Sequence, residues 1–368
     1  SSRLLLRLPA SQKPVEASGW WLDHFWSIPM FPRSVEGMQA LALRLMKGDA
    51  EVQFCVEMAR QEGWNPGLSD ASAFLATDSE GYIVAESKSP NPGTVPIGCI
   101  SCVQYPLTTT DGRPFRYCFL GFFIVAQEHR RKGIGAALWN GALEHGRQRD
   151  GGSDVVFGLD AVVEQRDRYA KSGFEVAFSS VRYELRVTST TVIERDDASA
   201  SGVSRLSADD AAVFDQLVAY DAAVFGCGRR SFLLPWVKNN ACFIHRANDG
   251  NIEGYIVIRE CFRGFKVGPL FADGLPTAEA LFGAAVDLVK DSKAKELSGG
   301  SSTIPVYLDC IDTDKNPHSH HLPDTYGMGE VFRTSRMYLK PQHSDGSEVS
   351  HLNGGLNKWY GVTTFELG

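Results

Sequence analysis

The chain has 368 residues, 43% of them hydrophobic and 22% charged, which is typical of a globular protein long enough for two domains with buried cores. Its formal net charge of -7 and pI of about 5.8 argue against general binding to nucleic acid or anionic membranes. No apolar run approaches the roughly 18–20 residues that a membrane span needs, so we expect a soluble protein.

The first residues, Ser1 to Pro9, are rich in arginine, serine and leucine, and no acidic residue precedes Glu16. This composition resembles the end of a mitochondrial transit segment, although a disordered terminus explains it equally well. We treat residues 1–23 as a lead-in. We expect a cytoplasmic protein, with a mitochondrial location as the alternative.

Two helical patterns of apolar residues follow, one around residues 38–45 and one around 52–58, with a break near Gly48. A turn-rich loop spans residues 63–70. Strands are then expected at 73–77, 82–87, 96–104 and 115–125, and the first two of them are expected to form a hairpin.

The run that ends at Val125 leads into a basic, glycine-bearing turn and a helix from about residue 132 to 149. Gly133 and Gly135 lack a Cβ, so backbone N–H groups at the positive end of this helix can close on a pyrophosphate. Hydrogen bonds to a charged group contribute roughly 1.5–3 kcal/mol each, more than an exposed ion pair. A Rossmann fingerprint would need three glycines, and a Walker loop would need Gly-Lys-Ser/Thr. Neither is present.

The full pattern of this turn is Val125, Glu128 and Arg130-x-x-Gly133-x-Gly135. It resembles the Gln/Arg-x-x-Gly-x-Gly/Ala signature of the GNAT superfamily of N-acetyltransferases, which holds the pyrophosphate of acetyl-CoA. The resemblance implies cofactor binding by the strand end, the loop and the helix start: Phe123, Ile124, Val125, Arg130, Arg131, Lys132, Gly133, Ile134, Gly135 and Ala136.

After the helix we expect a strand at 154–160, a short helix that carries Tyr169, and a closing hairpin from Gly173 to Tyr183. The elements make a mixed α/β sheet with helices on its faces. The same order is that of the resembled family, which gives a first, acetyl-CoA-binding domain at 24–187. The polar stretch 188–202 is typical of a linker.

The second part, residues 203–368, repeats the first in outline. Leu159-Asp160 returns as Leu308-Asp309, and Arg182-Tyr183 corresponds to Arg336-Met337-Tyr338. The spacing from Gly173 to Arg182 also recurs from Gly327 to Arg336, so the closing hairpin is expected twice.

The stretch 266–277 has an acid and prolines where the first part has its glycine loop, so we expect no pyrophosphate site there. The tandem arrangement resembles two-domain acetyltransferase-like proteins of the YitH type, whose second domain is a degenerate copy. That resemblance is carried by residues 63–67, the motif Phe225-Gly226-x-x-Arg229, residues 336–338 and residues 365–368.

The resemblance also implies the catalytic groups. Tyr169, four residues before Gly173, matches the family tyrosine that protonates the departing thiolate, although a core tyrosine is the alternative. Family members often carry a glutamate on the strand before the loop, but residues 118–123 offer none. Asp160 is therefore our candidate base, while the recurrence of an aspartate at Asp309 suggests a structural cap instead.

Other polar side chains are assigned more weakly. Trp64, Asn65 and Asp70 are candidates for the acceptor pocket, or for a turn held by an Asx bond. Arg229 is a further candidate that could face the cleft from the second domain, or lie on the surface. No metal site is expected from the histidines at 318–321. The eight cysteines lie mostly in apolar runs and are expected to be reduced and buried, with Cys99 and Cys102 on opposite faces of one strand.

We therefore expect an N-acetyltransferase that passes the acetyl group of acetyl-CoA directly to a primary amine of a small molecule or peptide. Direct transfer is preferred because the motif region has no cysteine that could carry the acyl group. A non-catalytic acyl-CoA-binding sensor is the main alternative, and an interaction scaffold is the second.

Overall fold

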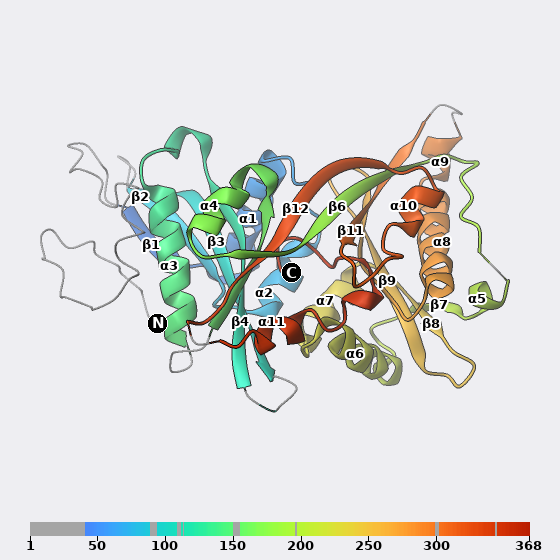
Figure 1. Cartoon of the computed structure of the whole chain (residues 1–368). Helices are drawn as coiled ribbons and strands as arrows, with labels where there is room; N and C mark the ends of the chain where they lie inside the picture. Colours follow the sequence, from blue (N-terminus) through green and yellow to red (C-terminus); the bar gives the residue numbers. More distant parts are fainter. Residues whose placement is uncertain are drawn as a thin grey trace, which may run out of the picture.

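The computed structural model describes residues 41–88, 94–108, 112, 114–149, 155–195, 197–298, 302–342 and 344–368. The expected lead-in at 1–23 and the start of the expected first domain lie outside these ranges. The described strands form one 13-stranded sheet. Figure 1 shows this sheet as two groups of elements joined by the long strands β6 and β12.

The first half of the described chain, residues 41–187, contains six strands and the helices between them. Its elements are β1 (Leu41–Leu45), α1 (Gly48–Gln61), α2 (Asp70–Thr77), β2 (Tyr82–Lys88), β3 (Thr94–Thr108), β4 (Pro114–Val125), η1 (Gln127–His129), α3 (Ile134–Gln148), β5 (Val155–Val162), η3 (Val163–Gln165), α4 (Arg166–Lys171) and β6 (Glu175–Val187).

The second half, residues 197–368, follows the same order and then adds a C-terminal strand. Its elements are α5 (Asp197–Ser201), β7 (Val203–Leu206), α6 (Ala211–Phe225), α7 (Arg230–Asn239), β8 (Ala241–Arg246), β9 (Ile252–Glu260), β10 (Phe265–Ala272), α8 (Leu275–Ser292), α9 (Ala294–Leu297), β11 (Ile304–Asp312), α10 (His321–Thr325), β12 (Gly329–Leu339), α11 (Ser347–Leu352), η4 (Leu356–Lys358) and β13 (Trp359–Gly361). Thus α5 lies within the stretch expected as a linker.

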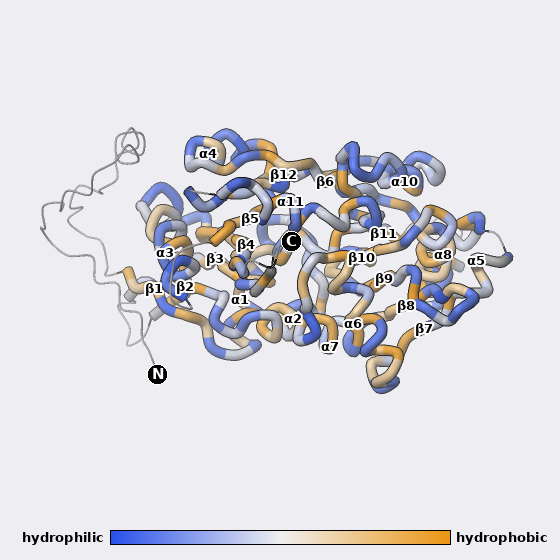
Figure 2. The backbone as a smooth tube through the Cα atoms, turned by 60° about the horizontal axis from the view of Figure 1, so that its bottom comes forward, coloured by the Kyte–Doolittle hydropathy of each residue, from blue (hydrophilic) through white to orange (hydrophobic). Residues whose placement is uncertain are grey.

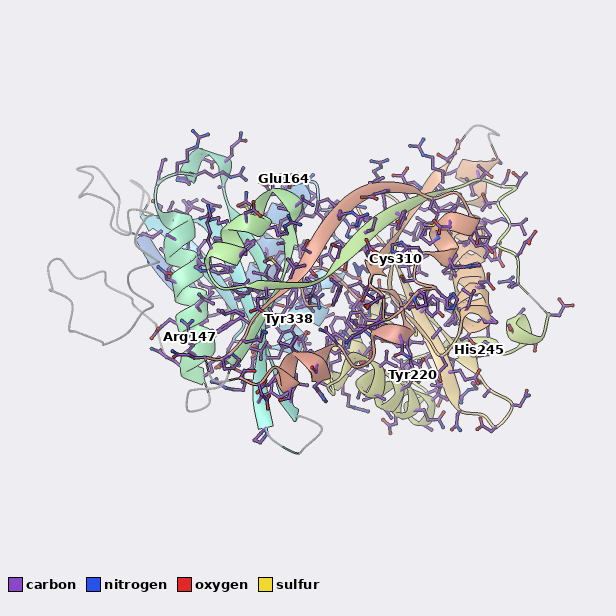
Figure 3. The ribbon with its side chains drawn as sticks, viewed as in Figure 1. Arg147, Glu164, Tyr220, His245, Cys310 and Tyr338 are labelled. Atoms are coloured by element: carbon purple, nitrogen blue, oxygen red, sulfur yellow. The ribbon has the colours of Figure 1, made fainter. Side chains whose placement is uncertain are left out.

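The two halves exchange their last long strands. The strand order is β1-β2-β3-β4-β5-β12-β6-β11-β10-β9-β8-β7, so β12 of the second half pairs with β5 of the first, and β6 of the first half pairs with β11 of the second. Tyr338 of β12 accordingly packs on Tyr117 of β4, with ring centroids 6.1 Å apart. In Figure 3 Tyr338 lies among elements of the first half, whereas Tyr220 and His245 lie in the second.

Two buried arginine–aspartate pairs hold the exchanged strands. Arg336 of β12 lies opposite Asp160 of β5 and donates to both carboxylate oxygens, at 2.8 and 2.9 Å. Arg182 of β6 lies opposite Asp309 of β11 and makes the same two-bond contact at 2.6 and 2.8 Å. Such bidentate, charge-assisted pairs fix both distance and orientation. The aspartates and arginines that recur in the sequence therefore form two ion pairs, each of which joins one half to the other.

Three expected elements were wrong. Leu41–Leu45 is a strand rather than a helix, because its leucines alternate with a period of two. Residues 70–77 form helix α2 instead of a strand, so no hairpin joins them to β2. The closing hairpins do not form within the described residues, since β6 and β12 are each a single strand that pairs with the other half.

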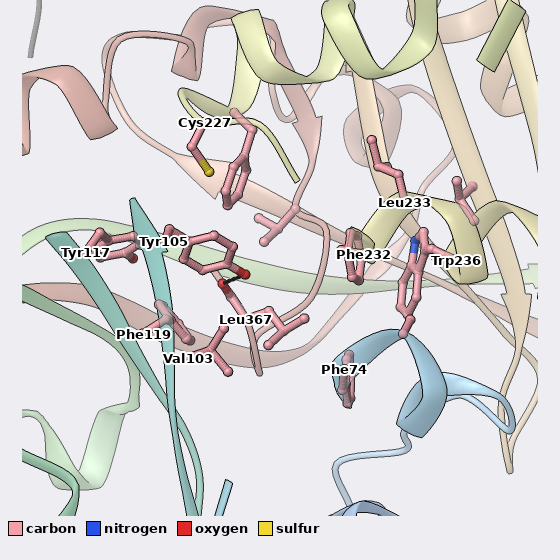
Figure 4. Packing of buried hydrophobic residues seen from close by; sticks show 14 of the residues in the cluster. Phe74, Val103, Tyr105, Tyr117, Phe119, Cys227, Phe232, Leu233, Trp236 and Leu367 are labelled. Carbon is pink, nitrogen blue, oxygen red and sulfur yellow. Dashed lines mark hydrogen bonds between the residues drawn. The ribbon is translucent and has the colours of Figure 1, made fainter. Parts of the chain in front are cut away.

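The largest apolar cluster runs across both halves. Figure 4 shows Phe74, Tyr105 and Phe119 of the first half close to Phe232 and Trp236 of the second, with Leu367 of the C-terminal segment between them. All eight cysteines are buried and free, as expected. Cys99 and Cys102 lie in the clusters on opposite faces of the sheet, which confirms that prediction. The C-terminal end reaches the middle of the molecule in two views (Figures 1 and 2).

Replacing Arg336 with alanine should lower the free energy of unfolding by about 3–5 kcal/mol, because it leaves the Asp160 carboxylate buried without its partner. Urea denaturation measures this. Arg186→Ala is the matched control on the neighbouring strand, since that side chain is 72% exposed and its pair with Glu184 should contribute about 0–1 kcal/mol. Equal losses in the two variants would contradict a structural role for the crossed pairs.

Candidate functional site

The bend in β4 opens the sheet next to the glycine loop. Phe122 has a φ of 47°, and the β3–β4 register shifts between Cys99 and Ser101. The parallel pairing of β4 with β5 ends at Leu120 opposite Leu159. Among the described residues, no strand pairs with β4 on this side beyond the bend. On the side away from β3, the backbone of residues 123–125 therefore has no strand partner in the described part of the chain, and the Val125 carbonyl there accepts from Arg130.

Helix α3 begins without a side-chain cap. Its N-cap Gly133 has a φ of 79°, which favours glycine, and the first loop-to-helix bond runs from the Ala137 N–H to the Gly133 carbonyl at 3.1 Å. The N–H groups of residues 134–136 thus have no acceptor inside the helix. These donors and the helix dipole make a concentrated site for an anion.

The basic side chains of the loop mainly fix its shape. Arg130 donates to the Val125 carbonyl at 2.9 Å through Nε and forms an ion pair with Glu62. The ammonium group of Lys132 donates to the Glu128 carbonyl at 2.8 Å. Arg131 is exposed and has a φ of 63°. Arg130 and Lys132 therefore bind the loop and its neighbours, whereas the backbone amides at the start of α3 have no acceptor inside the helix.

Tyr169 of α4 belongs to an aromatic stack that leads back to the bend. Its ring lies 5.3 Å from Trp139 of α3, and Trp139 lies 5.7 Å from Phe123. Burial raises the pKa of Tyr169 to about 12, while Arg168 lowers it to a smaller extent. The hydroxyl therefore keeps its proton throughout the physiological range.

Two of the expected site residues are held in buried ion pairs. Asp160 has a fully buried side chain and binds Arg336, which agrees with the alternative structural role and not with that of a base. Arg229 lies in the core of the second half, where it binds Asp221 at 2.8 and 2.9 Å and its guanidinium lies over the Phe225 ring. Arg229 therefore neither faces a cleft nor lies on the surface, and both expectations for it were wrong.

The candidates for the acceptor pocket lie where the halves meet. The Trp64 carbonyl accepts from Arg182 at 3.1 Å and from Lys266 at 3.3 Å. Asn65 exchanges two hydrogen bonds with the backbone of Arg263, both at 2.9 Å. Asp70 accepts from the Gly67 N–H, three residues before it, rather than from the N–H two residues after it as in an Asx turn, and its carboxylate lies 3.5 Å from Arg259.

A buried group of charged side chains, which sequence reasoning missed, surrounds these candidates. Arg259 of β9, Lys266 of β10 and Glu366 of the C-terminal segment are all at most 3% exposed. Burial lowers the pKa of Lys266 and raises that of Glu366. A charged residue inside an apolar strand, as in the runs at 254–260 and 265–272, was the available signal.

The corresponding place in the second half is occupied by the protein itself. Residues 126–133 separate β4 from α3, whereas only residues 273–274 separate β10 from α8. Beyond the last β10–β11 pair, β13 pairs with β10, and the Val362 N–H donates to the Asp309 carbonyl of β11 at 2.8 Å. The Cys310 thiol also donates to the Tyr360 carbonyl at 3.4 Å. β13 therefore fills, beside β10, the place that corresponds to the unpaired opening beside β4.

Other features do not compete with this site. In the part of the chain that the structure describes, no cluster of three or more metal-ligating side chains occurs, and no helix is long and apolar enough to cross a membrane. His321 is instead 3.1 Å from Glu279. A hollow of about 710 Å³ lies between α8 and β7 of the second half, and no residue of the glycine loop lines it.

Comparison with known families gives two matches in one chain. Residues 50–174 match the acetyltransferase (GNAT) family model, and residues 217–349 match a second acetyltransferase (GNAT) domain model. Holothin acyltransferase of Pseudoalteromonas sp. (strain SANK 73390) is 27% identical over 320 residues, which cover 86% of this chain and 92% of the relative. N-acetyltransferase YitH of Bacillus subtilis (strain 168) is 27% identical over 158 residues, 43% of this chain and 52% of that protein.

Solved structures agree at the level of the fold. A putative acetyltransferase from Pyrococcus horikoshii superposes with a TM-score of 0.63 at 20% identity. The match covers 92% of this chain and 99% of the other. A tandem GNAT protein from the clavulanic acid biosynthesis pathway gives a TM-score of 0.52 at 14% identity, over 83% of this chain and 100% of that one.

Alanine at the two loop glycines should affect stability differently. Gly133→Ala should cost about 1–2 kcal/mol, because its φ of 79° is left-handed. Gly135→Ala should leave the melting temperature unchanged or slightly higher, since the nearest atom to the new Cβ would be 3.6 Å away, in ordinary contact. Thermal unfolding compares them. A large loss in Gly135→Ala would show that the fold itself requires that glycine.

Proposed function

Because this chain belongs to the GNAT superfamily of acetyltransferases, as a tandem pair of its domains, we propose that the first half binds acetyl-CoA and transfers the acetyl group to a primary amine. The observation that supports this most directly is the uncapped start of α3 directly after the bend in β4. Only the first half has this combination within the described residues, because the loop before α8 is short and β13 lies beside β10.

The residues of the first half fit the cofactor that the family implies. The N–H groups of residues 134–136 can hold its pyrophosphate, with Gly133 and Gly135 leaving the approach open. The backbone of Phe123 to Val125 can pair with the amides of the pantetheine arm. Acetyl-CoA supplies the activated acyl group as a thioester. Bound N–H donors on β4 would stabilise the charge that develops on the thioester oxygen.

Tyr169 is the proposed proton donor to the departing thiolate. Its pKa of about 12 ensures that it is protonated at neutral pH, as a general acid must be. Asp160 is not carried into this mechanism, because its carboxylate is fully engaged with Arg336. Arg229 is likewise not carried into the acceptor site. The acceptor pocket is still proposed to be lined by Trp64, Asn65 and Asp70.

The acceptor is proposed to be a small-molecule or peptide amine. A relative that covers 86% of the chain is named holothin acyltransferase, so holothin is a reasonable first acceptor to test. Acyl groups longer than acetyl are compatible with the same backbone contacts. An acyl-CoA sensor is the second candidate, favoured by one observation: β4 carries no acidic residue.

Calorimetric titration of acetyl-CoA should find one site per chain, and Gly135→Glu should abolish it by placing a carboxylate against the pyrophosphate. Gly274→Glu is the matched control, since Gly274 is the N-cap of α8 in the second half. The Gly274→Glu variant should bind acetyl-CoA as the wild type does. Loss of binding in Gly274→Glu alone, or two sites in the wild type, would contradict a single site in the first half.

Tyr169→Phe should lower kcat by about 100-fold or more while leaving the acetyl-CoA Kd nearly unchanged, because it removes only the transferable proton. Release of free CoA is followed with holothin, spermidine and a lysine peptide as acceptors. Because the pKa of Tyr169 is about 12, its loss of a proton should not lower wild-type activity between pH 7 and 10. An unchanged kcat in the variant would exclude Tyr169 as the acid.

A further inference from the structure

An acetyl transfer to an amine needs a proton acceptor that β4 does not supply. An amine with an ordinary pKa of about 10.4 is mostly protonated at pH 7, and deprotonating it costs roughly 4.6 kcal/mol. None of the twelve residues of β4, Pro114 to Val125, is acidic. A carboxylate that takes this proton, directly or through water, has to come from another part of the chain.

The segment that follows β13 passes directly over this bend. It first lies against Gly268 of β10, where an added Cβ would collide with the Thr363 carbonyl. It then crosses to the first half, where a Cβ on Gly121 would collide with the Glu366 carbonyl. The Tyr105 hydroxyl of β3 donates to the Leu367 carbonyl at 3.2 Å and anchors the segment there.

The bend also directs residues toward this segment. Gly121 faces Glu366, and the next residue, Phe122, packs on Phe74 of α2 with ring centroids 5.5 Å apart. Two successive residues of β4 thus face the same side, as a bulge allows. Phe123, on the other side, packs toward Trp139 and α3. The C-terminal segment therefore meets β4 at the residues that precede the proposed thioester contacts, from the face opposite α3.

We propose that Glu366, brought from the second half by the C-terminal segment, is the proton acceptor for the amine in the transfer reaction of the first half. This inference rests on the proposed function. The Glu366 carboxylate takes one proton from the ammonium form of the acceptor, directly or through water. The free amine attacks the thioester carbon, the C–N bond forms and the C–S bond breaks. The departing thiolate takes a proton from Tyr169. The nitrogen of the new amide then loses a second proton, which restores the Tyr169 hydroxyl. Glu366 releases the first proton to solvent, so the reaction produces one proton in total.

The surroundings of Glu366 suit this role. Its side chain accepts a hydrogen bond from the Thr364 hydroxyl and is almost completely buried. Burial is the main cause that raises its pKa, and Asp70 of α2 acts in the same direction. Lys266 of β10, Arg259 of β9 and Arg182 of β6 act in the opposite direction without cancelling the effect. A carboxylate with a raised pKa is a stronger base at neutral pH than an ordinary glutamate.

Several buried polar atoms near this carboxylate have no hydrogen-bond partner among the described residues. They are all three guanidinium nitrogens of Arg259, one carboxylate oxygen of Asp70 and the hydroxyl of Tyr82. Burial is the main cause that raises the pKa of Tyr82, and the charge of Glu366 acts in the same direction to a much smaller extent. An unpaired buried polar group costs about 1–3 kcal/mol. The Tyr82 hydroxyl and the Nη atoms of Arg259 can therefore bind an acceptor or the water that carries its proton, whereas the Asp70 oxygen already lies 3.5 Å from Arg259 Nε.

The other carboxylates of this region are already committed. Asp309 binds Arg182 through both oxygens. Asp70 accepts from the Gly67 N–H and faces Arg259. Within the described residues, the Glu366 carboxylate accepts a side-chain hydrogen bond from the Thr364 hydroxyl alone, and the Glu366 carbonyl lies against Gly121 of β4. The geometry thus favours Glu366 over both aspartates.

The test compares Glu366→Gln with wild type in the free-CoA assay, with the same three amines, from pH 6 to 10. At pH 7 kcat should fall about 100- to 1,000-fold while the acetyl-CoA Kd stays unchanged. The deficit should shrink about tenfold per pH unit as solvent deprotonates the amine. Glu348→Gln is the matched control, a buried glutamate of α11 in the second half, and should retain wild-type kcat.

Glu366→Asp covers the case in which the glutamine variant does not fold. It should keep the pH profile of the wild type, since a carboxylate is still present, but lose at least tenfold in kcat, because its carboxylate is shorter by one methylene. A kcat within threefold of wild type in Glu366→Gln, or a deficit that does not depend on pH, would overturn the proposal for Glu366 alone. A wild type that binds acetyl-CoA but acetylates none of the amines would instead contradict the transferase function and this inference together.

Discussion

The two crossed arginine–aspartate pairs are the constraint on which the rest of the structure depends. Each pair joins a strand of one half to a strand of the other, and both are almost completely buried. A buried ion pair that loses one partner is strongly destabilising, so the exchanged strands have one acceptable register. That register places the end of β5 beside β12 rather than beside β4. The opening next to Phe123 lies just beyond the last β4–β5 pair, at the bend in β4.

The same framework produces two different outcomes in the two halves. Beside β4 the backbone is left unpaired, and a long loop turns the start of α3 toward the opening. Beside β10 the chain places β13 in the matching position and shortens the loop to two residues. A backbone strand offers the N–H and C=O groups that an extended ligand would otherwise supply. The second half therefore satisfies internally the contacts that the first half leaves for a cofactor.

The C-terminal segment links these outcomes. Having filled the opening of the second half as β13, it continues over the bend of the first half, where Glu366 adjoins Gly121. In this account the second half is more than a non-binding copy of the first. The second half fills its own opening and, in the proposed mechanism, contributes a carboxylate to the neighbouring one. This explains why β4 can lack an acidic residue.

The sequence predicted what local signals determine. The strand, glycine loop and helix around Gly133 follow from apolar runs and turn residues, and the buried cysteines follow from their neighbours. It did not predict that Arg336 would bind Asp160, because those residues are 176 positions apart and the pairing requires a strand exchange. The recurring aspartates and arginines were visible as a repeat, yet a repeat does not reveal which copy pairs with which. The strand at Leu41–Leu45 was misread although its alternation was present, and helix α2 depends on packing against α7 rather than on a strong amphipathic pattern.

A crystal structure of the whole chain with coenzyme A would test the central claim most directly. We expect one molecule per chain, with its pyrophosphate at the start of α3, its pantetheine arm beside Phe123 to Val125, and β13 still paired with β10. Coenzyme A between β10 and β11 with β13 displaced, or no coenzyme A beside β4, would contradict the account.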